Sequence, residues 1–235
     1  MKNLVITGAS KGIGKEIAKR FVIEGFNVFF CSSKKENVEK TEIELKSLNS
    51  KVNIYSAVVD LSRKEEIIKF AGLVKQKFSS INILVNNAGV FIPGKISDEA
   101  DGVFEHMMNL NLAAPYHLIR ELMENIKLAE KAHVFNICST ASIKPYMNGG
   151  SYCISKFGLL GFSKVLREEL KDKNVRVSSI LPGATLTDSW AGTDLPEERF
   201  IPAESIADIV FYTYQLPKEA VVEEILIRPQ LGDLG

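Results

Sequence analysis

The stretch that decides the fold class reads Asn3-Leu4-Val5-Ile6-Thr7-Gly8-Ala9-Ser10-Lys11-Gly12-Ile13-Gly14. Its first part is a near-continuous apolar run, which is typical of a buried strand in a parallel sheet. The three glycines remove side chains where a turn must be tight and where a phosphate must approach backbone N–H groups. A helix pattern follows as far as Glu24, and a helix N-terminus favours an anion. We therefore predict a strand, a phosphate-binding loop and a helix.

The spacing of these glycines is G-x-x-x-G-x-G, which differs from the G-x-G-x-x-G fingerprint of dinucleotide-binding loops. The alternative is a glycine-rich connection that binds nothing. Phosphate binding is favoured because the loop lies between a buried strand and a helix. The predicted phosphate-binding residues are Gly8, Ser10, Lys11, Gly12, Ile13 and Gly14.

Further strand and helix patterns alternate along the rest of the chain. The predicted strands are 3–7, 27–31, 52–59, 83–85, 132–138, 175–181 and 221–227, and the predicted helices after the first are 36–48, 63–78, 101–130, 151–171 and 203–215. Strands separated by helices of this length indicate right-handed βαβ units and a parallel sheet covered on both faces. No linker, repeat or low-complexity segment interrupts the pattern, so residues 1–235 are expected to form a single domain.

Composition excludes several classes of function. Hydrophobic residues make up 46% of the chain, and Lys plus Arg equal Asp plus Glu at 29 each, so no global field attracts nucleic acid or an anionic membrane. No apolar run is long enough to span a bilayer, and the chain start does not resemble a signal peptide. Three cysteines and three histidines are scattered without metal-ligand spacing. We expect a cytoplasmic protein with reduced thiols and no metal site.

The end of the second predicted strand bears on the choice of cofactor. A dinucleotide fold that prefers NAD usually places an acidic residue there, to accept a hydrogen bond from the ribose 2′-hydroxyl. This chain has Ser32, Ser33 and Lys34 at that position, and Lys11 lies within reach in the glycine loop. Such a pocket suits the 2′-phosphate of NADP. The alternative is a solvated loop that happens to be basic.

Polar residues follow several of the predicted strands. Asp60-Leu61, Asn86-Asn87-Ala88-Gly89 and Ser139 each come directly after a strand. Because ligands of parallel sheets bind beyond the carboxyl ends of the strands, we expect these segments to meet at one edge. Asn87 and Gly89 are also ordinary turn residues, so this reading is open for them.

The helix that begins near Ser151 carries Tyr152 and Lys156 on one face, because residues four apart on a helix are neighbours. A nearby ammonium favours the phenolate and lowers the pKa of a tyrosine towards the range useful in acid–base catalysis. Ser139 arrives from the preceding strand and is placed to hold a carbonyl oxygen beside the tyrosine. Tyrosine and lysine at this spacing also occur by chance on solvated helices. The pair alone therefore does not decide the function.

Two features of the long predicted helix over 101–130 stand out. Asn111 is unfavourable in a helix interior, so it is either a surface accident or a purposeful polar group. Pro115 is expected to disturb the helix at the same place. In the following helix, Gly158 and Gly161 suit close packing against another helix, either within the chain or in a partner subunit.

The chain resembles the short-chain dehydrogenase/reductase family over essentially its whole length. The motifs that carry the resemblance are, in order, Thr7-Gly8-Ala9-Ser10-Lys11-Gly12-Ile13-Gly14, Asp60-Leu61, Asn86-Asn87-Ala88-Gly89, Asn111, Ser139, Tyr152 with Lys156, and Pro182-Gly183-Ala184-Thr185-Leu186-Thr187. Each motif is weak alone, but the full set in this order is specific. The resemblance implies a doubly wound Rossmann fold of the α/β class, with about seven parallel strands and helices on both faces.

The resemblance also implies roles for individual residues. Tyr152 is expected to be the general acid or base, with Lys156 holding the nicotinamide ribose, Ser139 the substrate oxygen and Asn111 a water of a proton relay. The resemblance places Asp60 at the adenine, Asn87 and Gly89 at the adenosine ribose, and Pro182, Gly183, Thr185 and Thr187 at the carboxamide. Leu61 and Ala88 are further cofactor-binding residues that it implies. The cofactor supplies the hydride, and the protein supplies orientation and the proton.

These expectations describe an NADP(H)-dependent oxidoreductase that reduces a ketone or aldehyde. The alternatives are an NAD-linked alcohol dehydrogenase, a 3-oxoacyl carrier protein reductase, and a sensor that holds NADP without turnover. The last strand ends Ile227-Arg228-Pro229-Gln230, which resembles sepiapterin-reductase-like members more than carrier protein reductases. The polar segment 188–200 is expected to be a mobile substrate lid. Family dimers and tetramers imply a homodimer or homotetramer.

Overall fold

The computed structural model describes residues 1–187, 190 and 192–234. The strands are β1 (Asn3–Thr7), β2 (Asn27–Ser32), β3 (Ile54–Val58), β4 (Ile83–Asn86), β5 (Ala132–Ile137), β6 (Val175–Pro182) and β7 (Glu224–Ile227). The α-helices are α1 (Gly12–Ile23), α2 (Lys35–Leu48), α3 (Lys64–Lys77), α4 (Val103–Met108), α5 (Ala114–Lys127), α6 (Gly150–Leu170) and α7 (Ala203–Gln215).

One sheet runs through the described part of the chain, with seven strands in the order β3-β2-β1-β4-β5-β6-β7. Every neighbouring pair is parallel, with Leu4 opposite Val28 on one side of β1 and opposite Ile83 on the other. The predicted doubly wound α/β fold is therefore confirmed. The order reverses between β1 and β4, and such a switch point opens a crevice at the carboxyl edge of a sheet.

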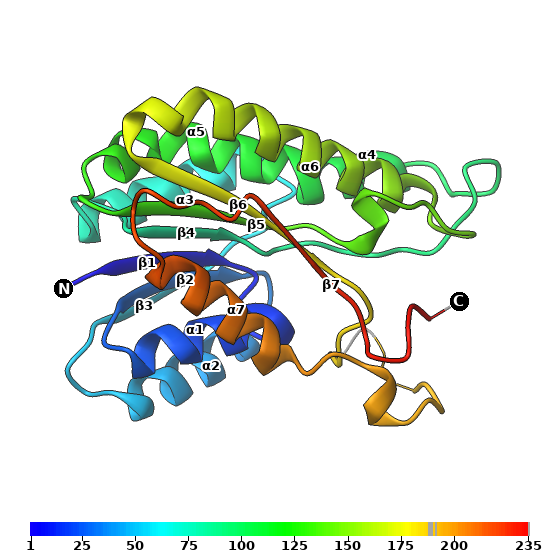
Figure 1. Ribbon diagram of the computed structural model, residues 1–235, viewed down its shortest axis with the longest axis horizontal. Helices are drawn as coiled ribbons and strands as arrows, with labels where there is room; N and C mark the ends of the chain where they lie inside the picture. The colour runs from blue at the N-terminus through cyan, green and yellow to red at the C-terminus, as the bar shows by residue number, and fades with distance from the viewer. Residues whose placement is uncertain (188–189, 191, 235) are drawn as a thin grey trace.

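Helices cover both faces of the sheet, as Figure 1 shows, with α1, α2 and α7 on one side and α3, α5 and α6 on the other. Side chains alternate along each strand, so β1 supplies Leu4 and Ile6 to one apolar core and Val5 to the other. The first core includes Phe21 and Tyr214, whose rings pack edge to face. The two cores hold the sheet rigid beneath its carboxyl edge.

The two edge strands are shorter than predicted. The strand expected over 52–59 spans Ile54–Val58, and the strand expected over 221–227 spans Glu224–Ile227. Each of them pairs with one neighbour only, β2 for β3 and β6 for β7. An edge strand extends only as far as its single partner provides hydrogen-bonding groups in register, and apolar periodicity does not report that limit.

The helical run predicted over 101–130 is divided into α4, a π-helical turn at Asn109–Ala113, and α5. Pro115 is the physical reason for the division, because it has no N–H to donate to the carbonyl of Asn111 and its ring crowds that carbonyl. A π turn inserts one residue and widens the helix locally. The predicted disturbance at this place is confirmed, and Asn111 is fully buried within it.

In the described part of the chain, we find no helix that combines the length and the apolarity needed to cross a bilayer. Nor does any group of three or more His, Cys, Asp and Glu residues lie together in a way that would hold a metal ion, again within the described residues.

Candidate active site

The glycine loop is folded so that side chains are excluded at its three glycines. Gly8 and Gly12 have positive φ angles of 65° and 54°, which residues other than glycine rarely adopt. A Cβ at Gly14 would lie 2.3 Å from Asn87 Nδ2, and one at Gly12 would lie 3.0 Å from Thr187 Cγ2. The loop is thus a closely fitted backbone cradle at the N-terminus of α1.

Two polar side chains join this loop to the end of β4. Asn87 Nδ2 donates to the carbonyl oxygens of Thr7 at 3.0 Å and Gly8 at 2.9 Å. In return, Thr7 Oγ1 accepts from the backbone N–H groups of Asn87 and Ala88, both at 3.1 Å. Thr7 was missing from the predicted site residues, because its partner lies 80 residues away on a strand whose place in the sheet is not readable from the chain.

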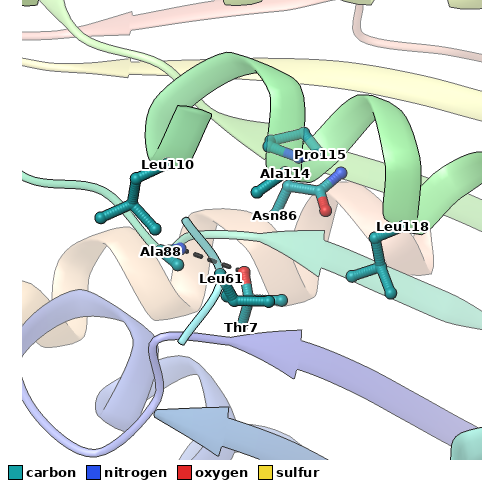
Figure 2. A pocket seen from close by; sticks show the side chains of 8 residues that line it. All are labelled: Thr7, Leu61, Asn86, Ala88, Leu110, Ala114, Pro115 and Leu118. Carbon is teal, nitrogen blue, oxygen red and sulfur yellow. Dashed lines mark hydrogen bonds between the residues drawn. The ribbon is translucent and has the colours of Figure 1, made fainter. Parts of the chain in front are cut away.

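The same region contains a closed gap beneath the switch point. Figure 2 shows its lining from β1, β4 and α5, with Thr7 hydrogen-bonded to Ala88 at its centre. The gap is too small to hold a water molecule, so it is a packing defect and no ligand site. Asn86 contributes a buried side-chain oxygen that has no hydrogen-bond partner among the described residues, while its Nδ2 donates to Asn136 Oδ1 at 2.7 Å.

The predicted 2′-phosphate residues lie together at the ends of β1 and β2. Ser10 Oγ donates to Ser32 Oγ at 2.7 Å, which links the glycine loop to β2. Gly8 N–H donates to the carbonyl of Cys31 at 2.8 Å and strengthens this link. Lys11, Ser33 and Lys34 are exposed around the pair. The surface at this point therefore offers hydroxyl and ammonium donors to an anion.

Asp60 lies at the carboxyl edge, beyond β3, but its carboxylate already has partners. Asp60 Oδ1 accepts from the N–H of Ser62 at 2.9 Å and from its hydroxyl at 2.7 Å. The hydrogen bond from the Ser62 hydroxyl is the largest of the effects that lower the pKa of Asp60. Leu61 beside it is buried.

Ser139 and Tyr152 meet at the carboxyl end of β5. Ser139 begins a short 3-10 turn over Thr140–Ser142, in which its Oγ accepts from the N–H of Ala141 at 3.1 Å. Tyr152 comes from the first turn of α6 and is half-buried. The Ser139 side chain lies close enough to the Tyr152 hydroxyl to lower the pKa of the phenol by hydrogen bonding. The predicted pairing of serine and tyrosine is thus present in the geometry.

The pKa of Tyr152 differs from expectation. Burial raises this pKa above its ordinary value, and the hydrogen bond with Ser139 offsets only part of the effect. The expected net lowering by Lys156 is therefore wrong for the chain as it stands. The physical reason is that burial of the phenol is the largest effect on its pKa, even with the Lys156 ammonium, which donates to the carbonyl of Ile137 at 2.8 Å, lying 5.8 Å from the centre of the Tyr152 ring.

Lys156 is itself buried, and burial lowers its pKa because a charged ammonium is poorly solvated there. It shares its surroundings with Asn111, since a Cβ at Gly89 would lie 3.2 Å from Asn111 Oδ1 and 3.6 Å from Lys156 Nζ. Gly89 thus leaves open the space in which the two polar groups meet. Gly89, Asn111 and Lys156 therefore come together from three segments that are distant in the sequence.

The side chain of Asn111 is fully engaged in hydrogen bonds. Its Oδ1 accepts from the N–H of Val90 at 2.9 Å, and its Nδ2 donates to the carbonyl of Val90 at 3.0 Å and to Ser155 Oγ at 2.9 Å. Ser155 Oγ in turn donates to the carbonyl of Tyr152 at 2.7 Å. The amide is therefore a purposeful group and no surface accident, and Ser155 is a supporting residue that the sequence did not single out.

The segment after β6 closes the far side of the edge. Gly183 N–H donates to the carbonyl of Ile227 at 2.7 Å, and Thr185 Oγ1 donates to the carbonyl of Gly183 at 3.0 Å. Pro182 is buried at the end of β6, and Thr187 lies against Gly12 of the glycine loop. The predicted carboxamide residues therefore lie between the glycine loop, which Thr187 approaches at Gly12, and the end of β7, to which Gly183 is bonded.

Aromatic rings border the Tyr152 hydroxyl on its open side. The ring of Phe91 packs edge to face on Tyr152 with 4.9 Å between the centroids, and Tyr146 packs on Phe91 at 6.2 Å. Phe91, Tyr146 and Ile143 are each more than two-fifths exposed, at 44%, 41% and 43%. Phe91 was not predicted, since a lone aromatic residue in a loop gives no signal in the sequence.

The predicted lid over 188–200 is described only in part. Residues 188, 189 and 191 lie outside the described residues, so the prediction of a mobile lid stays a prediction. At its far end, Glu197–Arg199 form a 3-10 turn and the ring of Phe200 packs on Trp190 at 5.0 Å. Ile201 pairs with Thr185, which ties the segment to the edge.

The fold and the site together define a doubly wound α/β protein of the Rossmann type, with Ser139, Tyr152 and Lys156 gathered beyond the carboxyl ends of its strands. The sequence model of the family described as short chain dehydrogenase matches residues 2–197. The chain belongs to the short-chain dehydrogenase family, as the sequence resemblance implied.

Individual relatives match over nearly the whole chain. A sepiapterin reductase of Chlorobaculum tepidum is 32% identical over 239 residues, covering 98% of this chain and 97% of the relative. A metagenomic short-chain oxidoreductase solved in complex with NADP is 30% identical, with a TM-score of 0.84 and 97% of each chain covered. An alcohol dehydrogenase of the archaeon Thermococcus sibiricus, complexed with 5-hydroxy-NADP, is 26% identical with a TM-score of 0.91, covering 100% of this chain and 99% of that one.

The cradle predicts a specific response to substitution at Gly14. Gly14→Ala places a methyl group 2.3 Å from Asn87 Nδ2 and 2.6 Å from the Gly8 carbonyl, so the loop must shift. We expect the free energy of unfolding in urea to fall by about 1–3 kcal/mol.

The control for this substitution is Gly72→Ala in α3, where an added Cβ meets nothing within 4 Å among the described residues. That variant should be unchanged or more stable by up to about 1 kcal/mol, since alanine favours a helix over glycine. Equal effects of the two substitutions would contradict the close fit of the loop.

Proposed function

We propose that this chain is an NADP(H)-dependent oxidoreductase that reduces a ketone or aldehyde to an alcohol by hydride transfer, with Tyr152 as the proton donor. The observation that carries the proposal is the meeting of the Ser139 and Tyr152 hydroxyls beside the buried ammonium of Lys156. The similarity to a sepiapterin reductase and to an NADP-bound oxidoreductase supports it.

The residues present fit a dinucleotide. The glycine cradle of Gly8, Gly12 and Gly14 leaves no room for side chains and exposes backbone at the N-terminus of α1, which suits a diphosphate. We assign Asn87, Ala88 and Gly89 to the adenosine ribose, Asp60 and Leu61 to the adenine, and the segment of Pro182, Gly183, Thr185 and Thr187 to the carboxamide. When bound, the reduced nicotinamide supplies the hydride.

The chain itself handles the oxygen and the proton of the substrate. Ser139 Oγ and the Tyr152 hydroxyl both donate to the substrate carbonyl oxygen, which polarises it. As the oxygen gains negative charge, Tyr152 transfers its proton to it. Because burial keeps the Tyr152 pKa high, the phenol is protonated at neutral pH, as a proton donor in the reductive direction must be.

The phenolate left on Tyr152 requires stabilisation. Lys156 Nζ, 5.8 Å from the centre of the ring, provides a positive charge for it in surroundings where charges interact strongly. We further assign Lys156 to the ribose hydroxyls and Asn111 to a water that returns the proton. Asn111 is suited to this because its fixed side chain holds its backbone in place beside Lys156.

The preference for NADP over NAD rests on the ends of β1 and β2. Ser32, Ser33, Lys34 and Lys11 offer donors to a 2′-phosphate, and the strand end has no carboxylate to repel it. An NAD-linked alcohol dehydrogenase, the main alternative, needs an acceptor for the ribose 2′-hydroxyl at this place instead.

The substrate side of the site is apolar. Phe91 packs on the Tyr152 ring, Tyr146 packs on Phe91, and both are more than two-fifths exposed, so burial of this aromatic surface by a ligand is favourable. A carbonyl compound with an aromatic or bulky apolar substituent therefore fits better than a small polar one. A carrier protein reductase remains an alternative whose substrate arm would lie along the same wall.

We also propose that the chain acts in the cytoplasm as a homodimer or homotetramer that associates through α6. Ile154, Phe157 and Val165 are 41%, 44% and 58% exposed and follow each other along one side of this helix. Gly161 lies between them with open space beside it, which permits close approach of another helix, whereas Gly158 packs against Leu112 of the same chain. The same side of α6 in a second copy of the chain would cover these exposed apolar side chains in a two-fold symmetric contact.

The central test is Tyr152→Phe, which removes the hydroxyl and keeps the ring. Turnover of a carbonyl panel, followed by NADPH consumption, should fall by about 10²–10⁴-fold, because the proton donor is lost. NADPH affinity should change little. Tyr212→Phe on the exposed side of α7 is the control and should retain full activity.

Undiminished turnover in Tyr152→Phe would overturn the proposed mechanism. If NADPH binds tightly to the wild-type chain but no carbonyl or alcohol of a broad panel is turned over, the sensor alternative is correct.

Cofactor choice is tested by fluorescence titration with NADPH and NADH at equal ionic strength. NADPH should bind at least about tenfold more tightly, which is the worth of one charge-assisted hydrogen bond. Ser32→Asp should abolish this preference by repelling the 2′-phosphate, while Ser47→Asp, exposed on α2, should not. Tighter binding of NADH by the wild type would exclude the NADP assignment.

Self-association is tested by light scattering coupled to size-exclusion chromatography. The wild-type chain should have two or four times the mass of one chain, and Val165→Glu should dissociate it by burying an unpaired charge. Ile43→Glu, on α2 where the side chain is 72% exposed, should leave the mass unchanged. A monomeric wild type would refute an interface on α6.

A further inference from the structure

Glu99 binds the start of the helix that carries Tyr152, although it lies 52 residues earlier in the chain. Its Oε1 accepts from the backbone N–H of Ser151 at 2.8 Å, and its Oε2 accepts from the Ser151 hydroxyl. Ser151 is buried, and Glu99 is half-buried at the floor of a surface groove of about 500 Å³.

Two glycines make this approach possible. A Cβ at Gly150 would lie 2.2 Å from Glu99 Oε1, and one at Gly94 would lie 2.6 Å from Glu99 Cγ. Gly94 is also bound to the entry of α6, because its N–H donates to the carbonyl of Asn148 at 2.9 Å and it pairs with Gly149. The segment 94–99 therefore lies directly on the first turn of α6.

The first turn of a helix needs such a partner. Its N–H groups have no acceptors within the helix, and its positive end favours a negative charge. Gly149, at the N-cap of α6, has no side chain to supply an acceptor. In the described part of the chain Glu99 forms no ion pair, so its charge is directed to the helix. Asp101 and Glu105 line the same groove without touching Ser151.

The opposite end of the same segment contacts the site from another side. Val90 is held by both polar ends of the Asn111 side chain, and Phe91 packs its ring on that of Tyr152. The segment 90–99 thus spans from Asn111 to Ser151 and passes over the phenol between them. Loss of either anchor frees a wall of the site as well as the helix start.

From this geometry we propose that Glu99 is a positioning residue for Tyr152. Its carboxylate fixes the first turn of α6 and the segment bearing Phe91, so that the phenol hydroxyl stands where Ser139 and the substrate oxygen meet it. This inference rests on the proposed function in its catalytic part. Its structural part, the anchoring of the first turn of α6, does not depend on any activity.

The test compares Glu99→Ala, which removes both acceptors, with Glu99→Gln, whose amide oxygen still accepts from the Ser151 N–H. Glu105→Ala is the matched control, because this residue lines the same groove and, within the described part of the chain, forms no side-chain hydrogen bond or ion pair with α6. Glu99→Ala should lower kcat by about tenfold, since small displacements of a reacting group are costly. The KM for NADPH should stay within about twofold, because the glycine cradle lies on other elements.

Rescue separates positioning from a general loss of stability. Glu99→Gln should recover kcat to within about threefold of the wild type, and Glu105→Ala should match the wild type. The melting temperature of each variant is measured, which shows whether that variant is folded at the assay temperature. Should Glu99→Ala fail to fold, Glu99→Asp takes its place, since its shorter side chain cannot reach both groups of Ser151, and it should show the same drop in kcat.

A second readout needs no turnover. Hydrogen–deuterium exchange of the backbone amides over 150–155 should quicken at least about tenfold in Glu99→Ala and stay unchanged in Glu105→Ala. Unchanged exchange, or a kcat within twofold of the wild type, would overturn the proposal. If the wild type shows no turnover at all, the proposed function fails, and the exchange result alone decides whether Glu99 anchors the helix.

Discussion

The side-chain amide of Asn87 is the contact on which the site depends, because it joins the two halves of the sheet where the strand order reverses. One nitrogen reaches the carbonyls of Thr7 and Gly8, while Thr7 holds the backbone of Asn87 and Ala88 in return. The glycine loop belongs to one half, and β4 leads directly into the segment beside Asn111 and Tyr152. A shift at this contact would therefore move the phosphate cradle relative to the proton donor.

In the half of the site that holds Lys156 and Tyr152, the pKa values of both side chains are set mainly by burial. Lys156 and Tyr152 both resist charging, because burial lowers the pKa of the ammonium and raises that of the phenol. Each group would be easier to charge in the presence of the other's charge. A site of this kind keeps the phenol protonated until a substrate oxygen draws the proton away, and the lysine then compensates the phenolate. The same burial excludes water that would otherwise solvate both groups.

Much of the fold and of the site was predictable, because the strands, the helices and several site residues are determined by residues close to one another in the sequence. The parallel sheet follows from apolar strands alternating with amphipathic helices. Ser139 was expected at a strand end and Tyr152 with Lys156 on one helix face, whereas the role of Asn111 came from the family resemblance. Thr7, Phe91, Ser155 and Glu99 were not predicted, because each acts on a residue of another segment. The predicted shift of the Tyr152 pKa was wrong in direction, because helical spacing indicates that Lys156 is near but does not indicate how deeply the phenol is buried.

Pro115 follows the π turn at Asn109–Ala113, and it affects both the stability of this helical run and the backbone next to the site. With an ordinary residue at 115, the helix would gain a backbone hydrogen bond and lose its π turn, and by helix propensity alone the chain would be improved. The gained bond, however, would be made to the carbonyl of Asn111, the residue whose side chain shares the space beside Gly89 with Lys156. Selection for thermal tolerance alone would thus tend to remove this irregularity, which makes position 115 one where greater stability would alter the backbone beside the site.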